Sequence, residues 1–550
     1  MAAWKEKYNT YLQKQQHQAI KEEHTNSRLT GGLQEDLQRL MAALGDNGDL
    51  VVRDFLLFGN RPAAMIFFSS LVSAEQIREH VLKPLMAPLP LHQDLPEPGP
   101  AMAHYIWSTA VQVTEGRAAA DIAGLPESAV KGELILLIDG VPEALLMDMR
   151  QVELRGVEAP QTEQVIRGPR EGFVEKLENN LSLLRYRLQS NDLRIEISPA
   201  GARTQSRIAL CYIESIADSR LIAEAMRRLS LIHTDGILDA GYIEQFIEDQ
   251  PLSPFPQVQN TERPDKTVAA LLEGRLAILV DGSPFALIIP ALFNQFFQTV
   301  DDYTERFIMG SLIRMIRLIA LACSLFFPAL YVSVISFNPE LMPTDFAVAI
   351  SGGRAGVPFP AVLEVLIMEV SMEVLREATI RLPQMIGGAL SIVGVLVIGQ
   401  AAVGAGLASP ITVVIVALTT IGSFATPAYN AAIALRMLRF PLIILAGMFG
   451  LYGVMIGTIL ILNHLLFLES FGVPYMSPYI PGKWRDLKDT LVRVPLWWMR
   501  RRPSFLHAED KDRLARQVPS IYEDQILRQE GEIREQSPAD HNTARSSRDQ

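Results

Sequence analysis

The C-terminal half of the chain contains apolar segments that are long enough to cross a lipid bilayer. A spanning helix needs about 20 apolar residues, because hydrocarbon offers no hydrogen-bond partner to exposed backbone groups. Residues 312–337, 385–407 and 441–468 meet this length. Residues 411–424 form a shorter run that follows a break at Ser409-Pro410. The pattern predicts an all-α transmembrane bundle with about four transmembrane helices.

Basic residues at the ends of these segments predict the orientation of the bundle. Arg314 and Arg317 lie at the start of the first crossing, and a basic stretch over 483–502 follows the last. Because cytoplasmic flanks are enriched in Lys and Arg, both ends should face the cytoplasm, and the number of crossings should be even. Arg436 and Arg439 conflict with four crossings, which place them on the outer side unless they snorkel or lie in a crevice of the bundle.

The N-terminal half carries one sequence unit twice. The chain reads KGELILLIDGVPEALLMDM near residue 131 and EGRLAILVDGSPFALIIP near residue 273, so that Asp139 and Asp281 begin matching Asp-Gly pairs 142 residues apart. Apolar runs that are bounded by Asp-Gly predict hairpin strands, and helical spacing over 72–85 and 216–229 predicts a helix in each copy. We therefore expect an α/β N-terminal region of two tandem duplicated subdomains with mixed sheets, joined by a helix over 171–189. The two aspartates are explained by the turn rather than by catalysis.

These features divide the chain into five parts. The parts are a polar N-terminal segment over 1–32, helical or disordered; a first α/β subdomain over 33–165; the linking helix and second subdomain over 166–305; a membrane domain over 306–480; and a basic interfacial segment with a disordered tail over 481–550. The N-terminal segment lacks the apolar core of a signal peptide. We therefore expect the N-terminal region and the C-terminal tail to lie in the cytoplasm.

An acidic helix is predicted over residues 358–383, between the first and second crossings. Glu369, Glu373 and Glu377 recur every four residues and form one stripe, and Glu364 lies further round near the start of the helix. Carboxylates at membrane depth usually face water or a partner charge. Repeated around the axis of an oligomer, the four glutamates would line a cation pathway.

Two other interpretations of this helix remain open. It could lie on the outer membrane surface, with its acids in water and Glu373 and Glu377 paired with Arg376 and Arg381. Alternatively, Glu369 could act as a proton carrier in a transport site.

Two further groups of residues are candidates for a mechanical role. The Pro-rich stretch over 251–266 is too stiff for a flexible linker and is a candidate coupling loop. Its candidate residues are Pro254, Phe255, Pro256, Arg263, Pro264 and Asp265. A recurrence of glycines along the last predicted crossing indicates close helix packing. These glycines are Gly447, Gly450, Gly453 and Gly457.

Several classes of function find no support in the sequence. The formal net charge of −11 argues against a nucleic-acid binder, because phosphate affinity comes from clustered Lys and Arg. Two cysteines, Cys211 and Cys323, cannot form a disulfide framework or a closed zinc site. Neither a nucleophile motif nor metal-ligand spacing is present, so we expect no catalytic residues, metal or cofactor.

Four long motifs resemble one known family. They are SPFPQVQNTERPD at 253–265, EGRLAILVDGSPFALIIPALF at 273–293, PFPAVLEVLIMEVSMEVLREATIRLP at 358–383 and SPITVVIVALTTIGSFATP at 409–427. Together they resemble the A subunit of GerA-type spore germination receptors, over roughly residues 35–510.

The resemblance implies a location, partners and an activity. Such A subunits lie in the inner membrane of the bacterial spore, beside a B subunit that resembles an amino-acid transporter and a C subunit that is a lipoprotein. They respond to small nutrients and are thought to form a homo-oligomeric, ligand-gated channel that releases monovalent cations. The alternative is a non-conducting receptor scaffold that relays nutrient binding to downstream partners. The sequence identifies neither the nutrient nor the number of subunits.

Overall fold

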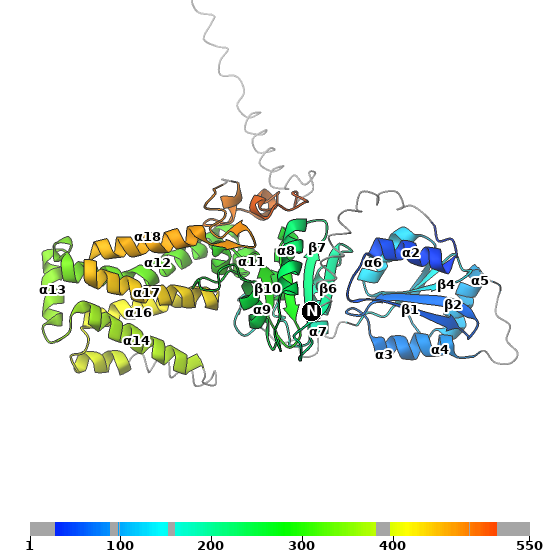
Figure 1. Cartoon of the computed structure of the whole chain (residues 1–550), viewed down its shortest axis with the longest axis horizontal. Helices are drawn as coiled ribbons and strands as arrows, with labels where there is room; N and C mark the ends of the chain where they lie inside the picture. The colour runs from blue at the N-terminus through cyan, green and yellow to red at the C-terminus, as the bar shows by residue number, and fades with distance from the viewer. Residues whose placement is uncertain are drawn as a thin grey trace, which may run out of the picture.

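The computed structural model describes residues 28–88, 97, 99–151, 160–380, 397–482 and 485–513. Three regions follow one another along the long axis: a first α/β unit, a second α/β unit and a helical region (Figure 1). The polar segment over 1–27, most of the predicted crossing over 385–407 and the tail after residue 513 lie outside the described residues.

The first unit is a five-stranded sheet with helices packed on it. The strand order is β1-β2-β4-β5-β3, and every described pairing is antiparallel. The strands are β1 (Leu50–Leu57), β2 (Arg61–Phe68), β3 (Gly116–Ala119), β4 (Glu133–Ile138) and β5 (Ala144–Asp148). The helices are α2 (Leu33–Leu44), α3 (Ala74–Gln76), η2 (Ile77–Leu82), α4 (Lys83–Met86), α5 (Pro100–Tyr105), η3 (Ile106–Ala110), η4 (Ile122–Gly124) and α6 (Leu125–Val130).

The second unit repeats this topology. Its sheet has the order β6-β7-β9-β10-β8, again antiparallel in every described pairing. The strands are β6 (Leu193–Ala200), β7 (Ser206–Ile213), β8 (Gln259–Thr261), β9 (Leu276–Val280) and β10 (Ala286–Ile289). The helices are α7 (Leu177–Arg187), α8 (Ser219–Ser230), α9 (Ala240–Ile247) and α10 (Pro264–Glu273). The predicted α/β class and the duplication are confirmed, and the sheets expected to be mixed are antiparallel because hairpins and helical crossovers return each strand in the opposite sense.

The aspartates of the two Asp-Gly turns accept equivalent hydrogen bonds in the two units. Asp139 Oδ1 accepts a hydrogen bond from the backbone N–H of Leu33, and Asp281 Oδ1 accepts one from Leu177, which are the first residues of α2 and α7. The following glycines have φ angles of 82° and 89°, as a tight turn requires. Each aspartate therefore joins a turn to a helix start, in agreement with a structural role.

The helix expected to link the two units over 171–189 is shorter than predicted. Helix α7 begins at Leu177 and corresponds to α2 of the first unit. The chain before it is held in extended form, where Phe173 N donates to Glu262 O at 2.7 Å. The units are joined instead by a buried ion pair, in which Arg185 Nε of α7 lies 2.6 Å from Asp49 Oδ2 of the first unit.

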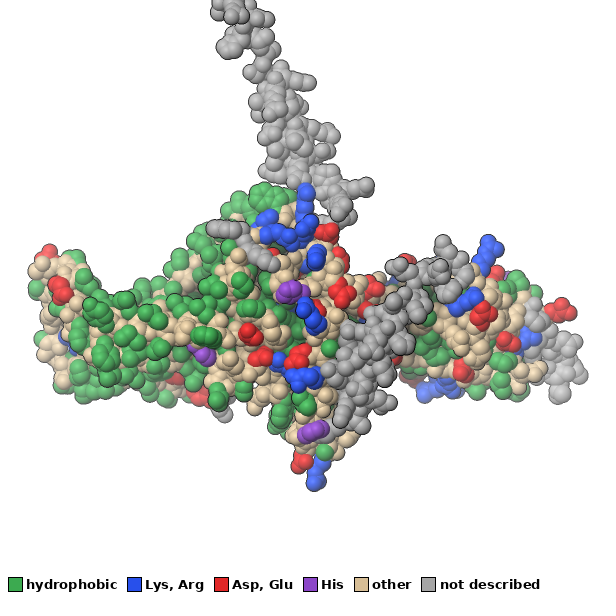
Figure 2. Space-filling model, turned by 45° about the horizontal axis from the view of Figure 1, so that its top comes forward, with side chains coloured by type: hydrophobic (Ala, Val, Ile, Leu, Met, Phe, Trp, Pro, Cys, Tyr) green, Lys and Arg blue, Asp and Glu red, His purple; other side chains and the backbone are tan. Residues whose placement is uncertain are grey.

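The helical region consists of long apolar helices that lie side by side along the long axis (Figure 1). Its elements are η5 (Phe293–Phe297), α11 (Asp301–Thr304), α12 (Phe307–Phe337), η6 (Pro339–Leu341), α13 (Thr344–Arg354), α14 (Ala361–Ile380), α16 (Pro410–Phe424), α17 (Tyr429–Phe449) and α18 (Leu451–Phe467). Helices α12 and α17 are long and apolar enough to cross a membrane, and α16 and α18 are shorter apolar helices. Hydrophobic side chains predominate among the side chains on the visible surface of this region, which has acidic side chains at its far end, whereas most of the visible charged side chains lie outside it (Figure 2).

The predicted single crossing over 441–468 is wrong, because the chain reverses at Gly450. This residue has φ 60° and ψ −140°, a conformation that only glycine adopts without strain. The first part of the segment belongs to α17, which already begins at Tyr429, and the second part forms α18. The two helices pack against each other as a hairpin. The apolar run continued through this turn and hid it.

The chain after α18 returns to the second unit. It contains β11 (Glu469–Ser470), β12 (Val473–Pro474), η7 (Asp486–Lys488), η8 (Leu496–Trp498) and η9 (Ser504–Leu506). Arg502 Nε donates to Leu272 O at 2.8 Å, and Glu509 N donates to Ile216 O at 2.9 Å. Within the basic interfacial segment and tail predicted over 481–550, Arg493 and Arg502 are buried against the protein.

Candidate functional site: charged pairs inside the helical region

Helix α14 places two of its four glutamates inside the helical region. The helix begins after Pro358 and Pro360, runs over Ala361–Ile380 and contacts α12, α16 and α17. Its four-residue glutamate spacing keeps the acids near one face. Met368 is buried on the inner side of the helix, and Val374 is exposed on its outer side. The glutamate stripe runs between these two sides, so that Glu369 is buried and Glu377 is exposed.

Glu369 forms a buried ion pair with α17. Its Oε2 lies 2.6 Å from Arg439 Nη1, and both side chains are 4% exposed. Arg439 Nη2 also donates to Ser324 Oγ of α12 at 2.7 Å, and Thr419 Oγ1 of α16 donates to Glu369 Oε1 at 3.2 Å. One carboxylate and its partners therefore connect four helices.

Glu373 lies one turn further along α14 and contacts two guanidinium groups. Its Oε2 is 3.0 Å from Arg376 Nη1, and its Oε1 is 3.4 Å from Arg436 Nε. Arg376 Nη2 donates in addition to Ser423 Oγ of α16 at 3.0 Å. The pair of Glu373 with Arg376, which the sequence suggested, is confirmed. Arg381, the other suggested partner, lies outside the described residues.

Glu364 lies near the opposite end of α14 and is fully buried. Its Oε2 is 3.3 Å from Arg354 Nε at the end of α13. Its Oε1 accepts a hydrogen bond from the backbone N–H of Ser409 at 2.5 Å, and Ser409 is the N-cap residue of α16. A carboxylate at this position interacts favourably with the positive end of the helix dipole.

Among the four predicted glutamates, Glu377 is the one with an exposed position on α14. Glu364 and Glu369 are inside the bundle of a single chain, and Glu373 is partly exposed. The structure therefore separates the predicted stripe into two inner and two outer carboxylates.

The predicted coupling loop lies where the second unit meets the helical region. Phe255 is buried, and its ring packs against His464 of α18 at a centroid distance of 6.1 Å. Ser253 Oγ lies 2.9 Å from His464 Nε2, and Tyr475 Oη donates to Pro256 O at 2.8 Å. The partner of His464 is 211 residues away, so no local pattern in the sequence indicates its role.

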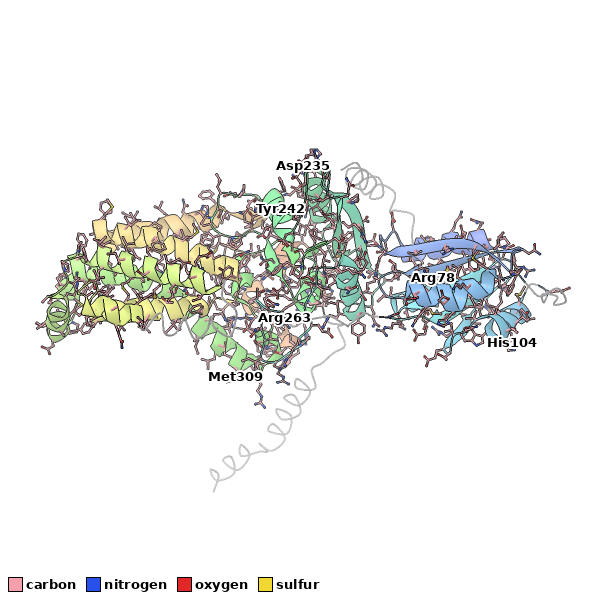
Figure 3. The ribbon with its side chains drawn as sticks, turned by 90° about the horizontal axis from the view of Figure 1, so that it is seen from below. Arg78, His104, Asp235, Tyr242, Arg263 and Met309 are labelled. Atoms are coloured by element: carbon pink, nitrogen blue, oxygen red, sulfur yellow. The ribbon has the colours of Figure 1, made fainter. Side chains whose placement is uncertain are left out.

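The second half of this loop starts helix α10. Arg263 is buried and pairs with Asp265, its Nη2 lying 2.8 Å from Oδ2, and Pro264 is the first residue of the helix. Figure 3 places Arg263 at the side of the second unit that faces the helical region. Pro254 lies at the other end of the loop, in an apolar groove that it shares with Gly457 of α18.

The four glycines of the predicted packing face all have close neighbours, although they belong to two helices and the turn between them. A Cβ atom on Gly453 would lie 2.0 Å from the carbonyl oxygen of Leu445, and one on Gly447 would lie 2.6 Å from Val362 Cγ2. Similar overlaps would arise at Gly450 and Gly457. Gly453 and Gly457 therefore permit the close approach within the α17–α18 hairpin, whereas Gly447 and Gly450 make room for side chains of α14 and α12.

The described residues define a protein with a duplicated α/β region and an apolar helical region whose charges pair in its interior. The chain matches the model of the Bacillus/Clostridium GerA spore germination protein family over residues 38–505, and it belongs to that family. It is 42% identical over 482 residues to the uncharacterized membrane protein YfkQ of Bacillus subtilis, which covers 88% of this chain and 93% of that protein. It is also 42% identical to spore germination protein KA of Bacillus subtilis, over 88% of each chain, and 38% identical to spore germination protein GerLA of Bacillus cereus, over 88% of this chain and 97% of that protein.

A solved structure also matches. It is the crystal structure of the N-terminal domain of the A subunit of the Bacillus megaterium spore germinant receptor GerK3, with 31% identity and a TM-score of 0.38, over 50% of this chain and 100% of that chain.

Proposed function

We propose that this chain is a subunit of a nutrient-responsive spore germination receptor, and that several copies assemble into a channel that releases monovalent cations when germination starts. The family relationship supports the receptor assignment. In this proposal the helical region spans the inner membrane of the spore, with the α/β units and the C-terminal tail in the cytoplasm. A transporter-like B subunit and a lipoprotein C subunit complete the receptor.

The observation that carries the channel proposal is the series of carboxylate–guanidinium contacts along α14. Charged groups inside an apolar helical region are costly, and where they persist they commonly mark a pathway for ions. Glu364 and Glu369 are paired within the chain, and in our proposal they hold the helices in the closed arrangement. Glu373 and Glu377 reach the surface of α14 and are the candidate lining of a pore between copies.

The junction around Phe255 is the proposed route by which the α/β units act on the pore. The ring of Phe255 contacts α18 through His464, and α18 packs on α17, which carries Arg436 and Arg439. A movement of the second unit would thus reach the charged pairs through two packed helices.

Vesicles that contain the chain with its B and C partner subunits test the proposal. Nutrient should trigger K⁺ efflux, and Glu373→Gln and Glu377→Gln should change the selectivity between K⁺ and Na⁺. Glu340→Gln is the matched control, because Glu340 lies on the exposed η6 between α12 and α13. Unchanged selectivity in both variants would exclude these carboxylates from the pore. Vesicles that respond to nutrient by a conformational change but never release ions would favour the scaffold alternative.

A further inference from the structure

A cavity of about 900 Å³ lies where the helical region meets the second unit. Helices α14, α16 and α17 form one side of it, and the start of α10 and residues 161–165 form the other. Figure 3 shows Arg263, which lines the cavity, on the same side of the second unit as the first turns of α12, where Met309 lies.

The wall of this cavity carries five cationic side chains, each of which has a carboxylate within ion-pair distance. Its cations are Arg263, Lys266, Arg317, Arg376 and Arg436, and the acidic residue among its lining is Glu163. Glu163 is already engaged, because its Oε1 lies 2.6 Å from Lys266 Nζ. Glu373, which is not among the lining residues, pairs with two of the arginines, Arg376 and Arg436.

Buried polar atoms on this wall have unused hydrogen-bonding capacity. Among the described residues, Arg376 Nε and Thr420 Oγ1 are buried and have no hydrogen-bond partner, whereas Arg436 Nε lies 3.4 Å from Glu373 Oε1. The two arginine side chains are 9% and 8% exposed. Leaving such groups unsatisfied costs free energy, and both unsatisfied atoms belong to residues that line this cavity, which supports a bound group that supplies their partner.

We propose that this cavity binds an oxyanion, the phosphate group of a lipid headgroup or of a small soluble molecule, through Arg376, Arg436 and Thr420. The planar donors of guanidinium groups match the oxygens of a phosphate, and a threonine hydroxyl can donate a further bond. Phe424, Met372 and Leu375 line the same cavity and offer an apolar surface to the organic part that carries the phosphate. The binding site is independent of whether the chain conducts ions.

The occupant would act on the charged pairs of α14. An oxyanion in contact with Arg376 and Arg436 competes with Glu373 for both guanidinium groups, because the oxyanion and the carboxylate seek the same donors. Occupancy would therefore release Glu373 toward the surface of α14.

Binding can be measured on the purified full chain. In a maltoside detergent, inorganic phosphate is titrated against chloride at matched ionic strength, and the rise in melting temperature is recorded. In parallel, the chain is placed in bilayers of phosphatidylcholine with or without phosphatidylglycerol, and retained lipid is identified by native mass spectrometry. A saturable response to phosphate identifies a soluble ligand, and selective retention of phosphatidylglycerol without a response to phosphate identifies a headgroup.

Thr420→Val is the decisive variant, because the Thr420 hydroxyl has no hydrogen bond to lose and the isosteric change should leave the fold intact. Its affinity should fall about tenfold, as expected for the loss of one hydrogen bond to a charged group. Thr458→Val is the matched control, since Thr458 Oγ1 donates to Val454 O within α18 and lies away from the cavity. Arg376→Lys keeps the positive charge but loses the planar arrangement of guanidinium donors, so its affinity for the oxyanion should also fall. Absence of binding in both arms, or equal affinity in Thr420→Val and the native chain, would overturn the proposal.

Discussion

Arg439 of α17 lies opposite Glu369 of α14, and their ion pair fixes the register of two antiparallel helices. Three residues earlier on α17, Arg436 approaches Glu373, which lies four residues later on α14. A spacing of three residues keeps the two arginines on one face of α17, and a spacing of four keeps the two glutamates on one face of α14. The two ion pairs therefore lie one helical turn apart along the same contact. Any change in the angle or register of α14 against α17 must break these contacts.

Loss of one partner of the Glu369–Arg439 pair should therefore destabilise the helical region strongly. Glu369→Gln leaves the Arg439 guanidinium buried without a carboxylate, and the cost of such a change is about 3–5 kcal/mol. The melting temperature and the yield of monodisperse full chain in detergent should both fall. The double variant Glu369→Met with Arg439→Leu removes both charges and should recover most of the loss. A double variant no more stable than Glu369→Gln would argue against the pair as the source of the effect.

The joint between the α/β units leads to a second prediction. Arg185 and Asp49 are almost fully buried, and the Arg185 guanidinium also stacks 4.0 Å from the ring centre of Phe68. Asp49→Asn removes the charge partner of a buried guanidinium, so the free energy of unfolding should fall by about 3–5 kcal/mol. Chemical denaturation of the full chain measures the change. Asp235→Asn is the control, because its pair with Arg203 is exposed and 3.9 Å long and should contribute less than about 1 kcal/mol.

The α/β fold was largely predictable because its signals are local and occur twice. Each Asp-Gly turn, with Asp139 and Asp281, lies between apolar runs that form adjacent strands, and the helices that follow the second strands have clear helical spacing. The linking helix begins later than predicted, because the residues before Leu177 are held outside it by a hydrogen bond from Phe173 N to the carbonyl oxygen of Glu262, which is distant in the sequence.

Only the carboxylate side of the charged pairs was predictable from the sequence. The spacing of the glutamates placed them together on α14, and Arg436 and Arg439 stood out as cations in an apolar segment. The pairing of these arginines with the glutamates could not be derived from the sequence. The apolar run over 441–468 suggested a helix that begins after Arg436 and Arg439, whereas the turn at Gly450 ends a helix, α17, that contains both arginines. The cavity residues come from separate segments spread over residues 161–436, so no spacing in the sequence brings them together.

Substitution of Gly453 should prevent the α17–α18 hairpin from closing. A methyl group there would overlap the carbonyl of Leu445, and backbone cannot move aside as a flexible side chain can. Gly453→Ala should therefore reduce the melting temperature of the purified chain by a large margin, with a cost of about 1–3 kcal/mol or more from overpacking. Gly352→Ala in α13 is the control, since a Cβ there meets nothing within 4 Å and alanine favours helix. Equal stability of the two variants would contradict close packing at Gly453.

The stability of the second unit should depend on pH through Glu244 of α9. Burial raises the pKa of Glu244 to about 7 from an ordinary value of 4.5, and the charges of Glu248 and Asp239 raise it further. Between these two values the folded chain holds a proton that the unfolded chain has lost, so stability falls as pH rises from about 4.5 to 7 and is constant above that range. After allowance for partial exposure, the loss should be about 2 kcal/mol.

Melting curves of the full chain between pH 5 and 8 check this dependence. Glu244→Gln mimics the protonated form, so it should raise the melting temperature at pH 8, have little effect at pH 5 and flatten the difference between them. Glu75→Gln serves as the control, because the Glu75 side chain is 81% exposed on the first unit. A native chain and Glu244→Gln variant that respond to pH in parallel would assign the dependence to another group. Because Glu248 accepts a hydrogen bond from Gln257 N next to the Phe255 junction, protonation of Glu244 would also bear on the contact between the second unit and α18.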